Sequence, residues 1–333
     1  MSGSGDPDQQ ACRVEQFSRL KQADRAELQA MPPGEAQSAV DRILHPRLWT
    51  IQDPRQLRWP GDFADADEED EPVEGFAPEE LASVFRSLQG AGWDAVLVGG
   101  QAVNLWARRY ERDLPAWQAL RPYTSRDLDY HGGLAEARVA LRILRAHGHL
   151  NTGADPGPHA AVLKVPLPSG RKLLVDILTA IYGVSAGDVE RTAVAWTGTG
   201  ALDGVQLRVI HPLLLLEGKA ASLRGLPQTG RQDAKHLSIM ILVLHEWLSE
   251  QLSVPRPVFR AVERLAACAA SPDGLHAFAQ GLDLMESLPL EAMRATEGFA
   301  DFLRQRLPQL LGKIARKREQ HLRALDGDSE SAG

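Results

Sequence analysis

The hydrophobic pattern of the chain changes at His211, and this change limits the folds that it can form. Between residues 76 and 210, short apolar runs typical of strands alternate with stretches at helical spacing. From His211 to residue 325 the spacing is helical throughout. We therefore predict an α+β fold, in which a small mixed β-sheet flanked by helices is followed by a C-terminal helical bundle.

The strands and helices of the first part are expected at defined places. The sequence predicts about four or five strands, at residues 94–98, 126–131, 160–167, 172–178 and 204–210. It predicts helices at residues 77–92, 99–111 and 134–148.

The ends of the chain differ in composition from this central part. Residues 64–75, ADADEEDEPVEG, form an acidic run typical of a solvated linker. We predict four parts: an N-terminal segment, partly disordered and ending in this linker, a sheet domain, a helical domain and a disordered tail. Their bounds are 1–75, 76–210, 211–325 and 326–333.

Composition excludes several classes of protein. A net charge of −7 rules out a basic surface over the whole chain of the kind that binds nucleic acid. Cys12 and Cys268 lie far apart, so they form neither a metal-type pair nor a disulfide framework, as in a reducing cytosol. The polar start MSGSGDPDQQ is unlike a signal peptide, and apolar runs stay below the roughly 18 to 20 residues of a membrane helix. We therefore expect a cytoplasmic protein.

Three aspartates stand on two of the predicted strands. Asp127 and Asp129 share one face of their strand because side chains alternate, and Asp176 lies opposite the apolar face of KLLVDIL. If the two strands are neighbours, the carboxylates converge. Two like charges about 4 Å apart repel by about 4 kcal/mol at an effective dielectric constant of about 20. Such a cluster requires protons or divalent cations, and its hard oxygen ligands suit Mg²⁺ or Mn²⁺.

A glycine pair precedes these acids. In AVLVGGQAVNLW, Gly99 and Gly100 join a predicted strand to a predicted helix. Glycine lets the backbone approach a ligand closely, and a helix N-terminus favours anions. A phosphate site beside a pair of carboxylate-bound metals indicates phosphoryl or nucleotidyl transfer.

The order of these motifs resembles the nucleotidyltransferase superfamily with the polymerase-beta-type palm. Strand–Gly-Gly–helix, SRDLD and the acid of LLVDIL carry the resemblance, which is strongest to the AbiEii-like, minimal toxin-type branch. The later segment LEGKAASLRGLPQTGRQDAKHLSIM resembles that branch as well. Its matching positions are Lys219, Arg224, Arg231, Asp233 and His236. The resemblance covers residues 78–250, so the domain at 76–210 would be the palm.

The resemblance implies an enzyme, a nucleotidyltransferase of the EC 2.7.7 type. It would use Mg²⁺ or Mn²⁺ to transfer an NMP from an NTP to a hydroxyl of RNA such as tRNA, of a protein or of a small molecule. The toxin-type branch also implies a role in a toxin–antitoxin or phage-defence system, with a cognate antitoxin protein as partner.

The resemblance also implies roles for the glycine pair, the three aspartates, Lys219 and Asp233. Gly99 and Gly100 would hold the triphosphate. Asp127, Asp129 and Asp176 would bind the metals, and Asp176 would also help to deprotonate the attacking hydroxyl. Lys219 would contact the phosphates. Asp233 would brace that lysine and belong to the nucleotide site.

The chain departs from the pattern in two places. The segment between Gly100 and Asp127 is longer than in the smallest members of the branch, and Gly100 stands where a serine is usual.

Two other interpretations remain open. The same fold can serve as a non-catalytic module that binds nucleotide or a partner. Separately, GVSAG at residues 183–187 matches the nucleophile elbow of serine hydrolases, with Ser185 as the nucleophile.

Overall fold

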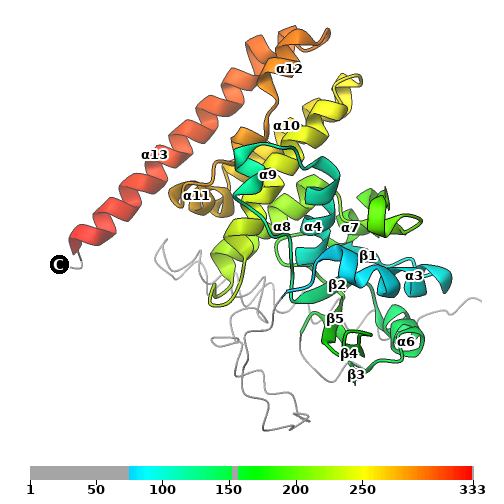
Figure 1. Cartoon of the computed structure of the whole chain (residues 1–333). Coiled ribbons are helices and arrows are strands. Elements are labelled where there is room, and N and C mark those ends of the chain that lie inside the picture. Colours follow the sequence, from blue (N-terminus) through cyan, green and yellow to red (C-terminus); the bar gives the residue numbers. More distant parts are fainter. Residues whose placement is uncertain (1–74, 152–156, 332–333) are drawn as a thin grey trace, which may run out of the picture. The chain divides into compact units, whose positions relative to one another are not determined.

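The computed structural model describes residues 75–151 and 157–331 (Figure 1). These residues belong to one compact unit, which begins at Asp70. The predicted N-terminal segment therefore lies outside the described residues, apart from Gly75.

A mixed seven-stranded sheet forms the first part of this unit, with strand order β3-β4-β5-β2-β1-β7-β6. The pairs β2/β5 and β1/β7 are parallel, and the other neighbours are antiparallel. The strands are β1 Val96–Val98, β2 Asp127–His131, β3 His147–Leu150, β4 His159–Pro166, β5 Lys172–Leu178, β6 Val194–Thr197 and β7 Gln206–Val209.

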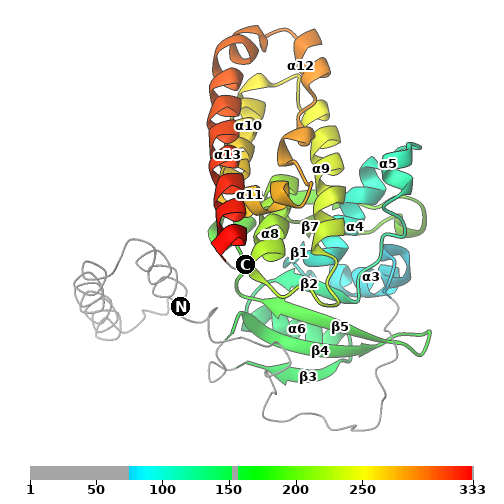
Figure 2. The ribbon, with the colours of Figure 1, turned by 90° about the vertical axis from the view of Figure 1, so that its left-hand side faces the viewer.

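Helices connect the strands and continue alone after β7. Within the sheet region they are η2 Pro78–Leu81, α3 Ala82–Gly90, α4 Gly99–Tyr110, α5 Pro115–Gln118, α6 Leu134–Ile143, α7 Ala186–Thr192 and η3 Gly200–Leu202. After the sheet come α8 Pro212–Gly225, α9 Asp233–Glu250, α10 Pro255–Ala269, α11 Pro272–Ala279, η4 Leu284–Ser287, α12 Leu290–Ala295, the π-helical turn η5 Phe302–Arg306 and α13 Leu307–Ser331. Figure 2 shows these later helices gathered apart from β3, β4 and β5.

Helix α4 joins the sheet to the later helices. It is buried on almost every side and packs against β1, β2, α8 and α9. Trp106, which is 1% exposed, donates a hydrogen bond from Nε1 to the carbonyl of Ile210 at 3.0 Å. One continuous hydrophobic core therefore runs through residues 76–210 and 211–325, which the sequence analysis assigned to separate domains.

The α+β fold class with a mixed sheet is confirmed, but the sheet is larger than expected. The two additional strands, β3 and β6, are its edges, and their residues are mostly exposed. Strands of four residues with few buried side chains show too little of the apolar alternation by which a strand is recognised. The helix expected over 134–148 was wrong at its end, because α6 stops at Ile143 and Arg145 turns the chain with a φ of 47°.

Helix α13 includes residues 326–331, which the sequence analysis assigned to a disordered tail. A helix that has already formed adds residues far more readily than a new one begins, so it can extend into a polar segment. None of the helices in the described ranges combines the length and apolar character needed to cross a membrane.

Candidate functional site

The structure brings Asp127, Asp129 and Asp176 together. Strands β2 and β5 are parallel neighbours, and their register sets Asp129 beside Asp176. One oxygen from each of the three carboxylates lies within 4.8 Å of the other two. All three side chains are partly buried on the face opposite Leu128 and Val175, which belong to the core.

Burial and mutual repulsion disfavour charge on this cluster. Burial raises the pKa of Asp129 well above its usual value, and the charges of Asp127 and Asp176 raise it further. The positive charges of Lys219 and Arg231 partly counter this rise. Burial, followed by the charge of Asp127, raises the pKa of Asp176 to about 7. Near neutral pH the cluster therefore binds protons, unless a cation replaces them.

The donor set fits a hard divalent cation. Asp176 Oδ1 is buried and has no hydrogen-bond partner among the described residues. The other oxygen, Oδ2, lies 4.0 Å from Nε2 of His159. Carboxylate oxygens are the ligands that Mg²⁺ and Mn²⁺ prefer. Asp127, Asp129 and Asp176 are thus the residues that would hold such an ion.

The glycine turn lies directly against the carboxylates. Gly99 has a φ of +66°, which a side chain would strain. A Cβ atom on Gly99 would lie 1.8 Å from Asp129 Oδ2, so only glycine fits beside that carboxylate. The first turn of α4, whose backbone N–H groups lack partners within the helix, therefore begins beside the acidic cluster.

Gly100 faces the side chains of Ser125, which carried no predicted role, and of His236. A Cβ atom at this position would lie 2.3 Å from Ser125 Oγ and 3.0 Å from His236 Cε1. Ser125 Oγ donates a hydrogen bond to Asp127 Oδ1 at 2.9 Å. A signal for Ser125 exists in the sequence, because residues two apart in an extended segment share a face.

Lys219 and Asp233 form the pair that the resemblance implies. Lys219 Nζ lies 3.0 Å from Asp233 Oδ1, and Arg231 Nε donates to Oδ2 at 2.6 Å. Burial alone would raise the pKa of Asp233, but the charges of Lys219 and Arg231 lower it below its usual value. Asp233 stays ionised and holds Lys219, on α8, against the start of α9.

Arg224 and His236, which also carry the resemblance, do not take part in the ion pair of Lys219 and Asp233. Arg224 pairs with Asp273 on α11 and is 45% exposed. His236 is buried, and neither ring nitrogen has a hydrogen-bond partner in the described part of the chain. Burial, with the charge of Lys219, lowers the pKa of His236 to about 3, so its imidazole is neutral.

The hydrolase elbow is not formed. Ser185 is exposed at the start of α7, and β5 ends well before it, at Leu178. A nucleophile elbow requires a strand that leads directly into the serine turn.

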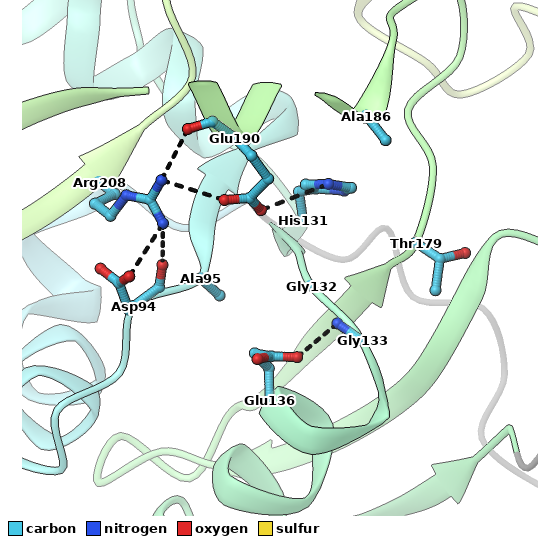
Figure 3. Close-up of a pocket in the computed structure, with 10 residues that line it drawn as sticks. All are labelled: Asp94, Ala95, His131, Gly132, Gly133, Glu136, Thr179, Ala186, Glu190 and Arg208. Atoms are coloured by element: carbon cyan, nitrogen blue, oxygen red, sulfur yellow. Dashed lines mark hydrogen bonds and ion pairs between the residues drawn. The ribbon is translucent and has the colours of Figure 1, made fainter. Parts of the chain in front are cut away.

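A hollow of about 440 Å³ lies away from the carboxylates, at the opposite end of β1 (Figure 3). Its charged side chains bind one another. Arg208 contacts Asp94 and Glu190, and Glu190 Oε1 lies 3.6 Å from Nε2 of His131. Glu136 accepts a hydrogen bond from the backbone N–H of Gly133. These contacts hold the ends of the strands together and leave the acidic cluster as the better candidate site.

Comparisons of the chain with protein-family models, with curated proteins and with solved structures gave no match. The site is therefore interpreted from its own residues and geometry.

The first prediction concerns the pH dependence of metal binding. Folding raises the pKa of Asp176 from 3.8 to about 7, so the folded state binds the proton more tightly than the unfolded state. In metal-free protein this contribution to stability is present below pH 4 and is lost as the pH rises towards about 7. A cation competes with the proton, so the half-saturating Mn²⁺ concentration should fall about tenfold between pH 6 and pH 8.

The half-saturating Mn²⁺ concentration is measured by thermal unfolding in a Mn²⁺ titration at pH 6 and at pH 8. Asp176→Asn should reduce the pH dependence, because only Asp129 then keeps a raised pKa, whereas Asp301→Asn, at an aspartate that is 81% exposed, should leave it unchanged. If the half-saturating Mn²⁺ concentration of the unchanged protein were the same at both pH values, the assignment of Asp176 as a metal ligand would be contradicted.

The second prediction compares two glycines with similar backbone angles. Gly99 and Gly92 have φ values of +66° and +71°, but a Cβ atom on Gly92 meets nothing within 4 Å. Gly92→Ala should cost about 1–2 kcal/mol in the free energy of unfolding, from backbone strain alone. Gly99→Ala should cost more and should also abolish Mn²⁺-dependent stabilisation, because its methyl group displaces Asp129. Urea denaturation with and without Mn²⁺ measures both effects. If Mn²⁺ stabilised Gly99→Ala as much as the unchanged protein, the close contact between position 99 and Asp129 would be contradicted.

Proposed function

We propose that the chain is a Mg²⁺-dependent nucleotidyltransferase, which transfers an NMP from an NTP to an acceptor hydroxyl and releases pyrophosphate. One observation carries the proposal: Asp127, Asp129 and Asp176 converge beside Gly99, at the start of α4. A divalent cation bound by these carboxylates would lie next to a helix N-terminus that favours phosphate, and this supports the proposal.

The residues of the chain have separate tasks in this reaction. Asp127, Asp129 and Asp176 would hold Mg²⁺ or Mn²⁺, which supplies charge stabilisation to the attacking oxygen, the leaving oxygen and the phosphate between them. Gly99 and Gly100 let the backbone of α4 approach the triphosphate. Lys219, held by Asp233, contacts the phosphates and meets the negative charge that develops there.

The bonds that form and break in this reaction balance without a further reactant. The acceptor oxygen forms a bond to the α-phosphorus of the NTP, and the bond from that phosphorus to the oxygen bridging to the β-phosphate breaks. Pyrophosphate leaves with the electron pair. The hydroxyl proton would pass to the carboxylate of Asp176, the base that the resemblance implies.

The resemblance to the AbiEii-like branch supports the wider assignment. We propose a cytoplasmic enzyme of a toxin–antitoxin or phage-defence system, with an antitoxin protein as partner. The acceptor is RNA such as tRNA, a protein or a small molecule. The mainly acidic chain favours a local contact with the acceptor over broad electrostatic binding of nucleic acid.

The third prediction tests the transfer itself. The purified protein is incubated with Mg²⁺ and each of the four NTPs labelled at the α-phosphate, with total RNA, cell lysate or the protein itself as acceptor. One fraction should become labelled. Asp127→Asn and Asp129→Asn should lower the labelling at least about 100-fold, because each removes a metal ligand. Asp301→Asn, at an exposed aspartate, should leave it unchanged.

Two results would contradict the proposal. Label that persists in both Asp127→Asn and Asp129→Asn would show that the carboxylates are not the catalytic site. Thermal stabilisation by an NTP that depends on Mg²⁺, without label in any fraction, would instead support a module that binds nucleotide without chemistry.

A further inference from the structure

Ser125 is fixed from several sides, just before β2. Its backbone forms an isolated antiparallel bridge with Phe76, with N–O distances of 2.8 and 3.1 Å. Gln101, in the first turn of α4, donates from Nε2 to the carbonyls of Phe76 at 2.9 Å and Ser125 at 3.3 Å. Both Gln101 and Ser125 are buried, at 0% and 5% exposure. The position of Ser125 is thus tied to the glycine turn.

The hydroxyl of Ser125 is directed at one metal-binding candidate. It donates its hydrogen to Asp127 Oδ1 at 2.9 Å. A hydrogen bond to a carboxylate is about twice as strong as one between neutral groups, and low solvent exposure strengthens it. Each carboxylate oxygen has two lone pairs, so Asp127 keeps acceptor capacity for a cation. The hydrogen bond therefore fixes the orientation of the carboxylate and leaves lone pairs available to bind a cation.

Gly100 provides the space that Ser125 occupies. A Cβ atom on Gly100 would lie 2.3 Å from Ser125 Oγ and 2.9 Å from Ser125 Cβ. Rotation about χ1 could move Oγ away, but it would break the bond to Asp127 and would not move Cβ. On the other side the same atom would meet His236 Cε1 at 3.0 Å. A side chain at position 100 and the Ser125–Asp127 bond exclude each other.

We infer that Ser125 is a positioning residue of the metal site: it orients Asp127 for the cation, and Gly100 lacks a side chain because the serine hydroxyl takes its place. This inference rests on the proposed function, since it assumes that Asp127 is a metal ligand. The hydroxyl group beside Gly100 is thus supplied by Ser125, which stands 25 positions later in the chain.

The fourth prediction tests this role through Mn²⁺ affinity, measured by isothermal titration calorimetry on the full chain. Ser125→Ala should weaken Mn²⁺ binding at least about tenfold, the usual effect of losing a group that orients a ligand. Ser238→Ala is the matched control, because Ser238 Oγ bonds only to the carbonyl of Ala234 within α9 among the described contacts. It should bind Mn²⁺ like the unchanged protein.

A double-mutant cycle separates positioning from a general loss of structure. If Ser125 acts through Asp127, Ser125→Ala should change Mn²⁺ affinity by less than about twofold when Asp127→Asn is already present. If Ser125→Ala instead damages the fold, its loss of Mn²⁺ affinity should add to the loss caused by Asp127→Asn. Thermal unfolding in EDTA reports the stability of each variant separately.

A residue swap tests the packing. Gly100→Ser alone should weaken Mn²⁺ binding and lower the unfolding temperature, because its side chain collides with Ser125. Gly100→Ser with Ser125→Gly should recover most of both losses, since the collision is removed and one hydroxyl remains between α4 and Asp127.

The outcomes distinguish this inference from the proposed function. Unchanged Mn²⁺ affinity in Ser125→Ala, additive losses in the cycle, or no Mn²⁺ binding by the unchanged protein would overturn the role of Ser125. The expected Mn²⁺ results without labelled product from any NTP would support Ser125 and overturn nucleotidyl transfer.

Discussion

The mutual repulsion of three carboxylates is the constraint on which the rest of the site depends. The parallel register of β2 and β5 sets Asp127, Asp129 and Asp176 side by side, and one oxygen from each carboxylate lies within 4.8 Å of the other two. The cluster must therefore share protons or bind a cation, and the raised pKa values of Asp129 and Asp176 express this constraint. Either a proton or a divalent cation relieves this repulsion, and the proposed function requires the cation.

The surrounding elements are arranged around this cluster. Gly99 brings the first turn of α4 against Asp129, and Gln101 ties the same turn to Ser125, which bonds to Asp127. On the other side, α8 and α9 carry the ion pair of Lys219 and Asp233, and the charge of Lys219 reaches Asp129. Because α4 packs against both the sheet and α9, the helices after β7 help to shape the site.

The sequence predicted the parts of the site that follow local rules. Alternation along a strand placed Asp127 and Asp129 on one face and Asp176 opposite an apolar face, and the glycine pair marked the start of a helix. It did not show that the two strands are neighbours, because pairing is set by contacts between distant residues. Ser125 was overlooked although it stands two residues before Asp127, on the same face; only its contacts with Phe76 and Gln101 are distant in sequence. The edge strand β3 is mostly exposed, and β6 has four residues of which only Trp196 is buried, so the sheet was predicted too small.

The most direct test of the account is a crystal structure of the protein grown with Mn²⁺ and a non-hydrolysable NTP, with anomalous scattering used to locate the metal. We expect Mn²⁺ to be bound by Asp127, Asp129 and Asp176, with the triphosphate against the first turn of α4 at Gly99 and Gly100. Anomalous density elsewhere, for example in the hollow lined by Asp94, Glu136 and Glu190, with none at the three carboxylates, would contradict it.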